Sequence, residues 1–521
     1  MKKFLFSLVV AFATLQLSAA PVDLVSAKSK AQQCVASTME LHGMKNKFSS
    51  LEPSLVLTQK GTNNPDCVVY YIFNTAQSFI IVAGDDRAEA ILAIGDRPLD
   101  VDCIPENMKA LLDTYGEQID KLLSNPDIKV KKTFNANVRL HAISVEPLLT
   151  AMWDQHEPYF DQCVFNDYQC LTGCPATSAS MVYYYWKYPV DATPDVPGYS
   201  FNLNYSVWES VTVDVPSLPS VTFDWENMLD SYLDGYSSEQ GNAVATLMRY
   251  IGQAECMNYG TPEMGSGLPA DSAALNIAEA FIFYGYDKNT VRTVKKTSSL
   301  NNGQTLYSDE EWATMIQDEL IEQRPIVFTA DSFIGGHAFN VDGYDGANNL
   351  YHVNYGWSGN GNGYFALNAF SDGSALYNNY QQMVIGIQPT YDGPAVQVST
   401  NKLNFECFTG ETTSQSFMVS GRDLTGDVTV TIEDENGVFS SDVASVSLID
   451  TQQEGGKEVV VTFAPQLMGD YATTVTLTSA NAKKAVIRLY AKATLRKETP
   501  ITQEATEIHT TSFCANWSDE T

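Results

Sequence analysis

Residues 171–188 read LTGCPATSASMVYYYWKY, and the interpretation of this chain starts from them. The run from Cys174 onward is apolar with helical spacing until Pro189 stops it. A helix that begins at Cys174 places the thiol beside unpaired backbone N–H groups and the positive end of the helix dipole, which lower the pKa of a cysteine. Gly173 permits a close approach of the chain, and Pro175 suits a first helical turn. Cys174 is therefore a candidate nucleophile, although a cysteine in an apolar run is also typical of an inert core.

A thiolate nucleophile needs an imidazole partner, and the chain has six histidines. His337 follows Gly335 and Gly336 and begins a strand-like run, and the two glycines, which allow a substrate to approach closely, are candidate substrate-binding residues. His352 lies in the middle of a strand pattern and is expected to be a satisfied histidine, whereas His156 lies in a loop and fits either role. The other three fall in the leading part or the tail of the chain: His42, His141 and His509.

The residues around this stretch, 142–392, carry helical patterns first and strand patterns after. Helical spacing continues at 243–256 and 270–283. Strand-like runs with glycine-rich turns follow at 325–330, 337–344, 350–355, 363–367 and 383–387. Helices followed by strands indicate an α+β domain rather than alternating βαβ units.

Smaller units are expected on both sides of this domain. Residues 21–141 combine helical patterns at 25–41 and 106–124 with two β-rich runs, which indicates a small α+β unit. Residues 395–496 contain short alternating runs separated by turns, as in a β-sandwich. Residues 498–521 begin a further strand pattern, and the sequence is expected to break off inside that module.

The first residues of the chain have the pattern of a targeting segment. Residues 1–20 have a basic start, a short apolar run and small residues at the end, which is the pattern of a secretory signal peptide. The protein is therefore expected to be secreted or associated with the cell surface. No later stretch reaches ~18 uninterrupted apolar residues, so no membrane span is expected.

The charge composition of the chain indicates which partners it can bind. The 521 residues include 31 basic and 62 acidic side chains, which give a formal net charge of −31. A field of this sign repels phosphate backbones, so no nucleic acid partner is expected. The chain has nine cysteines, an odd number, so at least one thiol has no partner within the chain, and a nucleophile would explain it.

Other chemistries fit less well. The chain has no HExxH, P-loop, GxSxG or CxxC pattern. The spacing of His156, Cys163, Cys170 and Cys174 does not match a structural zinc site, so no metal and no cofactor is expected. A disulfide between Cys163 and Cys170 stays open, because spacing cannot decide it.

Several motifs of the chain resemble those of a known protein family. WDQ at 153–155, TGC at 172–174, GGHAF at 335–339, HVNYGW at 352–357 and GYF at 363–365 occur in this order. Together they resemble the active-site region of the streptopain/interpain family, which are secreted bacterial cysteine peptidases with a papain-like fold. The resemblance covers about residues 145–392.

The flanking parts resemble further modules. FIIVAGDDR at 79–87 resembles part of the pro-domain of that family, so residues 21–141 are expected to inhibit the peptidase. Residues 395–496 resemble an immunoglobulin-like module. Residues 498–521 resemble the opening of a fibronectin type III module.

The resemblance also implies roles for individual residues. It makes Cys174 the nucleophile and His337 the general acid/base, with an oxyanion hole formed by the Gln155 side chain and the Cys174 backbone N–H. Trp357 matches an aromatic residue that shields the histidine. Members of the family read Asn-Trp-Gly-Trp where this chain has NYGW, so the residue that orients His337 stays open among Asn354, Tyr355 and Trp357.

The expected protein is a secreted cysteine endopeptidase that hydrolyses proteins and peptides and is made as an inactive precursor. Its own pro-domain is expected to act as an intramolecular inhibitor until it is removed at a loop-like segment before Val145. The resemblance implies a hydrophobic substrate side chain at the second position before the cut. The alternative is a catalytically inactive surface adhesin or binding protein with a peptidase-like domain, which the β-sandwich tail would suit.

Overall fold

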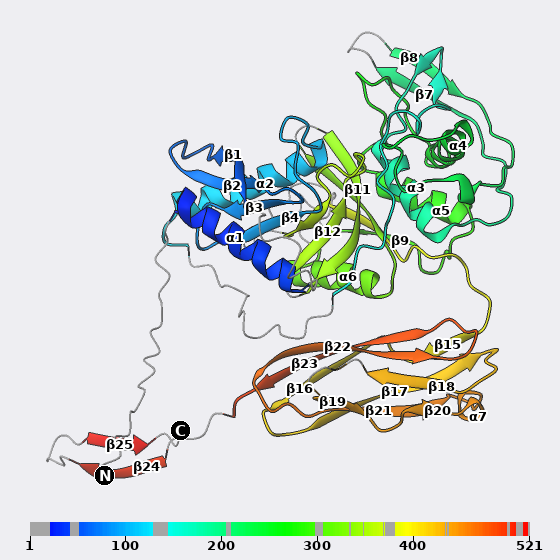
Figure 1. Ribbon diagram of the computed structural model, residues 1–521. Coiled ribbons are helices and arrows are strands. Elements are labelled where there is room, and N and C mark those ends of the chain that lie inside the picture. Colours follow the sequence, from blue (N-terminus) through cyan, green and yellow to red (C-terminus); the bar gives the residue numbers. More distant parts are fainter. Residues whose placement is uncertain are drawn as a thin grey trace. The chain divides into compact units, whose positions relative to one another are not determined.

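The structure is a computed structural model (Figure 1). It describes residues 21–41, 52–128, 144–204, 210–296, 306–332, 335–346, 348–367, 369, 381–432, 434, 437–496, 501–506 and 514–518. The expected signal peptide lies outside the described residues, as do His42, His141 and His509. The chain divides into two compact units. One combines the described residues up to 128, which we call the leader, with Ser144–Thr390, and the other contains Tyr391–Thr521.

An antiparallel sheet of ten strands runs through the first unit in the order β1-β2-β3-β4-β13-β12-β11-β10-β14-β9. The leader supplies β1 (Ser54–Lys60), β2 (Val68–Asn74), β3 (Phe79–Ala83) and β4 (Ile91–Gly95). The later residues supply β9 (Arg292–Lys295), β10 (Ile326–Ser332), β11 (Gly335–Asp345), β12 (Leu350–Asn354), β13 (Gly363–Phe365) and β14 (Gln382–Ile385). Strand β4 pairs with β13, so the leader continues the sheet of the residues that follow it.

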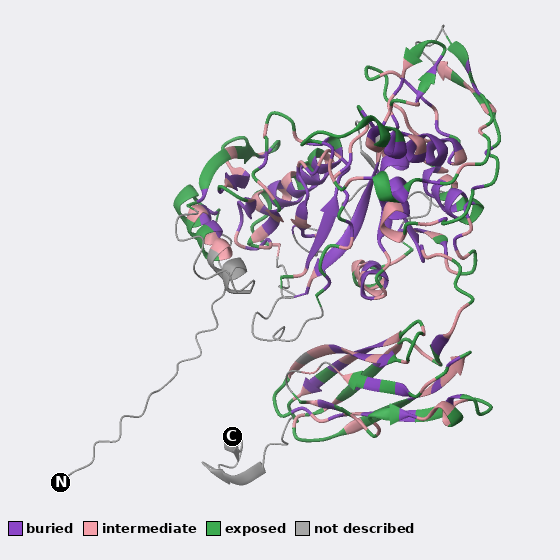
Figure 2. Ribbon diagram, turned by 45° about the vertical axis from the view of Figure 1, so that its right-hand side comes forward, coloured by how far each residue is buried: buried purple, intermediate pink, exposed green. Residues whose placement is uncertain are grey.

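The centre of this sheet is buried, and its leader edge is exposed (Figure 2). All five residues of β12 are buried, whereas β1 is exposed along nearly its whole length. Helices α1 (Leu24–Leu41) and α2 (Glu106–Ser124) pack on the leader strands. Helix α2 has the predicted bounds, and it buries an apolar stripe that includes Leu111, Leu112 and Ile119. None of the described helices is both long enough and apolar enough to cross a lipid bilayer.

A helical part lies beside the sheet and contains α3 (Cys174–Trp186), α4 (Ser238–Ala254) and α5 (Ala273–Phe283) (Figure 1). Its core is aromatic: Tyr183 stacks on Phe281 with ring centroids 4.4 Å apart, and Trp153 is fully buried. Helix α6 (Asp309–Ile321) begins with a capping box and packs on β10 and β11. Shorter elements complete this part: β5 (Val164–Phe165), β6 (Tyr168–Gln169), β7 (Tyr199–Asn204), β8 (Ser210–Val215) and the 3-10 turn η1 (Trp225–Asn227).

The second unit is a two-sheet β-sandwich. One sheet has the order β15 (Ala395–Val398), β17 (Thr413–Arg422), β21 (Lys457–Phe463) and β19 (Phe439–Ser441). The other has the order β16 (Lys402–Phe408), β23 (Ala485–Thr494), β22 (Gly469–Thr478), β18 (Val428–Ile432) and β20 (Ser445–Val446), with β16 and β23 parallel. The short helix α7 (Leu448–Thr451) belongs to the same unit, and β24 (Ile501–Thr506) and β25 (Cys514–Ser518) form a separate hairpin. Alternating burial in β18 and β21 follows the predicted pattern of a half-buried strand.

Candidate active site

Cys174 is the first residue of α3, as the sequence predicts. The chain enters the helix through Gly173 with φ of 88°, and a Cβ atom there would lie 2.8 Å from Met257 Sδ, so the turn favours glycine. Cys174 Sγ accepts a hydrogen bond from the Ala338 backbone N–H at 3.3 Å. This contact joins the helix to β11.

The predicted lowering of the Cys174 pKa is wrong for this conformation. Desolvation raises the pKa of the thiol to about 11, and the carboxylates of Glu255 and Glu106 act in the same direction. The backbone N–H groups of Ala338 and Cys174 lower the pKa, as expected at a helix start, but burial has the larger effect. At neutral pH the sulfur is therefore a thiol.

His337 lies near the start of β11, opposite Ala330 of β10. Its side chain is 15% exposed, and Nε2 makes no hydrogen bond to any residue that the structure describes. Glu106 Oε2, in the leader, lies 3.8 Å from Nε2. Burial lowers the pKa of His337, and Glu106 offsets this only in part, so the imidazole is neutral at neutral pH.

One cavity of about 650 Å³ brings the candidate residues together. They come from segments far apart in the chain, and all of them line it: Gln155, Cys174, His337 and Trp357. The leader contributes Glu106 to the same lining. The sequence gives no sign that Glu106 belongs to this cavity, because it lies at the start of a distant helix.

The loop of Gln155 is held by Asp154. The Asp154 carboxylate accepts hydrogen bonds from the backbone N–H groups of Gln155 and His156, and it also contacts His156 Nδ1 at 2.6 Å. Its second oxygen accepts from Ser358 Oγ at 3.1 Å, and the Thr172 N–H donates to Gln155 O at 3.4 Å. Asp154 therefore ties the Gln155 loop to the residue after Trp357, although the sequence reveals only the motif that contains it.

Of the three residues considered for orienting His337, only Trp357 lines the cavity. Asn354 is buried, and its Nδ2 donates to Ala151 O at 2.8 Å while its Oδ1 accepts from the Gly356 N–H at 3.1 Å. Tyr355 packs against Phe339 in the core. The structure thus uses Asn354 to shape the loop before Trp357 and gives it no described contact with His337.

The remaining candidates are placed as follows. Gly335 and Gly336 begin β11, pair with the end of β10, and are not among the described residues that line the cavity. His156 is exposed at the rim of the cavity. His352 is a buried, satisfied histidine, as predicted, between Asp342 and Asp96.

The cysteines and acids form no metal site in the part of the chain that the structure describes. Cys163 and Cys170, the pair left open for a disulfide, are free thiols inside an apolar cluster with Phe165 and Tyr259. Burial raises the pKa of Cys163 to about 12, which suits an inert core thiol.

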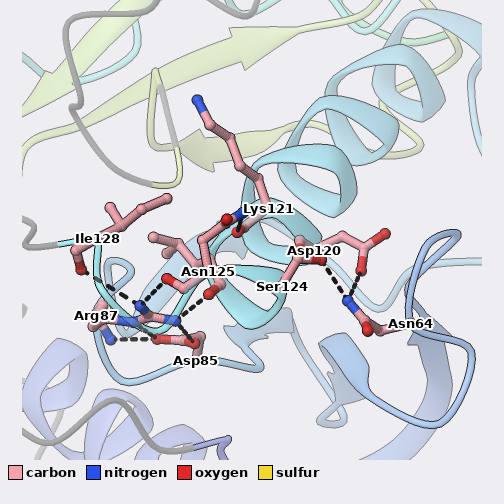
Figure 3. A network of polar contacts seen from close by, with 9 residues as sticks. Asn64, Asp85, Arg87, Asp120, Lys121, Ser124, Asn125 and Ile128 are labelled. Carbon is pink, nitrogen blue, oxygen red and sulfur yellow. Dashed lines mark hydrogen bonds and ion pairs between the residues drawn. The ribbon is translucent and has the colours of Figure 1, made fainter.

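The leader reaches the cavity through α2, and a polar network holds the far end of this helix (Figure 3). Arg87 makes a two-pronged ion pair with buried Asp85 and donates to the Asn125 carbonyl at 2.9 Å. Asn64 donates to both Asp120 and Ser124 in the last turns of the helix. With the C-terminal end of α2 fixed in this way, its first residue, Glu106, faces His337.

Further contacts bind the leader along the sheet. Asn107 Nδ2 donates to the Tyr355 carbonyl at 3.1 Å, and Asn360 Nδ2 donates to the Cys103 carbonyl at 2.7 Å. Where the leader strands meet the later strands of the sheet, Asp96 accepts a hydrogen bond from His352 Nε2 at 2.9 Å. Backbone pairing, amide contacts and the charged contact between His352 and Asp96 therefore join the leader to the later residues.

Known proteins are similar to this chain in sequence. Residues 153–365 match the profile of the Peptidase C10 family, and residues 19–119 match that of the Spi protease inhibitor. Streptopain of Streptococcus pyogenes serotype M1 is 27% identical over 341 residues, which cover 61% of this chain and 80% of streptopain. The thiol protease/hemagglutinin PrtT of Porphyromonas gingivalis is 26% identical over 342 residues, which cover 62% of this chain and 37% of PrtT.

A solved structure supports the fold described above. A prointerpain A fragment of Prevotella intermedia superposes with a TM-score of 0.50 at 27% identity, and the match covers 65% of this chain and 100% of that fragment. The match spans the leader and the later residues together. The expected α+β fold is therefore confirmed, namely a papain-like domain after an α+β pro-domain, with an all-β sandwich at the C-terminal side.

Proposed function

We propose that this cysteine peptidase zymogen of the streptopain/interpain type is a secreted endopeptidase with Cys174 as its nucleophile. The observation that carries this proposal is the convergence of distant segments on one cavity, which is lined by Gln155, Cys174, His337 and Trp357. The expected signal peptide at residues 1–20 favours export.

The proposed reaction is acyl transfer. The Cys174 thiolate attacks the scissile carbonyl, and the developing oxyanion accepts hydrogen bonds from the Gln155 side-chain amide and the Cys174 backbone N–H. His337 then donates its proton to the departing amine, which leaves an acyl-enzyme. Water attacks the acyl-enzyme with His337 as general base, and the thiolate returns. Trp357 lies at the same cavity and limits the access of water to the imidazole.

The leader acts as the intramolecular inhibitor. It contributes Glu106 to the cavity, where the carboxylate faces His337 Nε2 and disfavours a thiolate at Cys174. With a raised thiol pKa and a lowered imidazole pKa, the pair is neutral, whereas the reaction needs a thiolate and an imidazolium. Removal of the leader uncovers both groups to solvent.

The proposed organisation follows from this role. Residues 1–20 are the signal peptide, residues 21–141 are the inhibitory pro-domain, and residues 142–392 are the peptidase domain. Residues 395–496 form the immunoglobulin-like module, and residues 498–521 begin a fibronectin type III-like module. The peptidase cleaves its own precursor in the segment before Val145.

Maturation of the purified precursor tests the proposal. Cys174→Ala precursor should stay at full length under conditions in which the wild-type chain loses its leader, and a thiol-directed epoxysuccinyl inhibitor should label Cys174 in the matured enzyme. Cys256→Ala is the matched control, because Cys256 is an exposed thiol that does not line the cavity, so this variant should mature and be labelled normally. Equal processing of the wild type and the Cys174→Ala variant would refute self-cleavage. A matured chain without a Cys174 adduct would refute the catalytic assignment.

A further inference from the structure

Three residues that line the catalytic cavity carry a buried polar atom without a hydrogen-bond partner among the described residues: Thr329 Oγ1, His337 Nε2 and Gln382 Oε1. The proposed proton transfer explains the free nitrogen of His337. It does not use Thr329 or Gln382, which are only 6% and 2% exposed. A buried polar atom without a partner is costly, so these two atoms need another explanation.

The two residues are neighbours on one face of the sheet. Thr329 of β10 pairs with Gln382 of β14, and on its other side it pairs with Ala338 of β11. Directly paired residues of antiparallel strands project from the same face. The Ala338 N–H of β11 donates to Cys174 Sγ. The unpaired atom of Thr329 therefore lies one strand away from this contact, and that of Gln382 lies two strands away.

The contacts of Gln382 fix which of its atoms is free. Its Nε2 donates to the Ala270 carbonyl at 3.1 Å, and a carbonyl can only accept, so the remaining atom is the acceptor Oε1. The Thr329 hydroxyl can both donate and accept. The two residues therefore offer one acceptor and one group of either kind.

The cavity of about 650 Å³ that Thr329 and Gln382 line can admit a substrate side chain. Its lining also includes small or aliphatic residues, namely Leu268, Ala270, Ala273 and Ala330. We call these four residues, with Thr329 and Gln382, the Thr329–Gln382 pocket. None of the six carries a charge.

We propose that the Thr329–Gln382 pocket selects a substrate side chain that is uncharged and both donates and accepts hydrogen bonds, namely serine, threonine, asparagine or glutamine. This inference rests on the proposed function and names its substrate class. An apolar side chain would leave both polar atoms unpaired, and a carboxylate would face the Gln382 acceptor. The pocket therefore departs from the hydrophobic preference that the family resemblance implies.

The test is a cleavage profile of the matured enzyme on a peptide library that varies every position on both sides of the cut. Wild type should prefer serine, threonine, asparagine or glutamine at one position. In matched peptides that differ there only by threonine or valine, kcat/KM should be about tenfold higher for threonine, because valine has the same shape but leaves the buried atoms unpaired. Thr329→Val and Gln382→Met should each reduce this ratio at that position and no other.

Thr329→Ser is the matched control, because it keeps the hydroxyl and should keep the preference. A wild-type preference for apolar side chains at every selective position, or an unchanged profile in Thr329→Val and Gln382→Met, would overturn the inference. Titration of Cys174 with iodoacetamide separates the two proposals. An enzyme that cleaves peptides with the wrong preference, and whose activity is lost when Cys174 is alkylated in a parallel sample, refutes only the pocket, whereas a chain that neither reacts nor cleaves refutes the proposed function.

Discussion

The contact between leader and peptidase at His352 leads to a quantitative prediction. His352 Nδ1 lies 2.6 Å from Asp342 Oδ1, and Nε2 lies 2.9 Å from Asp96 Oδ2. His352 and Asp342 are almost fully buried, whereas the Asp96 side chain is 44% exposed. The two carboxylates outweigh desolvation and raise the pKa of His352 to about 10, so the imidazole is charged at neutral pH. Asp96→Asn keeps the shape of this contact and removes one of the charges.

A hydrogen bond to a charged group contributes about 1.5–3 kcal/mol, and the exposure of Asp96 reduces this through solvent screening. We therefore expect Asp96→Asn to lower the unfolding free energy of the Cys174→Ala precursor by about 1 kcal/mol at pH 6.5. The pKa of His352 is higher in the folded chain than its ordinary value of 6.5. Its stabilising effect is therefore complete below pH 6.5 and is lost progressively as the pH rises to about 10.

Urea unfolding of the precursor, followed at pH values from 6.5 to 10, measures both effects. The difference between the Asp96→Asn variant and its parent should shrink as the pH approaches 10. Asp66→Asn is the matched control, because it removes an exposed leader carboxylate that makes no contact with His352. Equal losses in the two variants, or a difference for Asp96→Asn that does not change with pH, would refute the reasoning.

Two further predictions concern the nucleophile. Gly173→Ala forces a side chain into a backbone with positive φ and into its neighbours, so it should cost about 1–3 kcal/mol in urea unfolding and slow alkylation of Cys174 in the matured enzyme. Glu106→Gln removes a carboxylate that raises the pKa of Cys174, so alkylation of the unprocessed precursor by iodoacetamide should become faster, with a pH midpoint below about 11. An unchanged midpoint would show that Glu106 exerts no electrostatic effect on the sulfur.

The sequence predicts elements whose signals are local. Helix α2 has the predicted bounds because its apolar stripe repeats with helical period, and α3 ends close to Pro189 as expected. Strand β1 gives no such signal, because it is exposed on both faces. The pairing of β4 with β13 joins residues more than 250 positions apart, so no sequence window contains both strands.

The same distinction applies to the site. Cys174, His337 and Gln155 lie in recognisable motifs, and the structure brings all three to one cavity. Thr329, Gln382 and Glu106 have no motif, because each belongs to the site only through the register of a strand or the position of a helix end. The pKa of Cys174 is predicted in the wrong direction, since the sequence reveals the helix start but not the residues that cover the sulfur.

This last difference bears on the proposed inhibition of the enzyme by the leader. The donors that lower the pKa of Cys174 are the backbone N–H groups of Cys174 and Ala338, and both belong to the peptidase. Among the influences that raise it, Glu106 belongs to the leader, and the same residue lines the cavity. Loss of the leader removes the Glu106 carboxylate, which raises the pKa of Cys174 and also that of His337, and leaves the two donors in place. We therefore predict that the thiol pKa falls on removal of the leader without any change in the helix start.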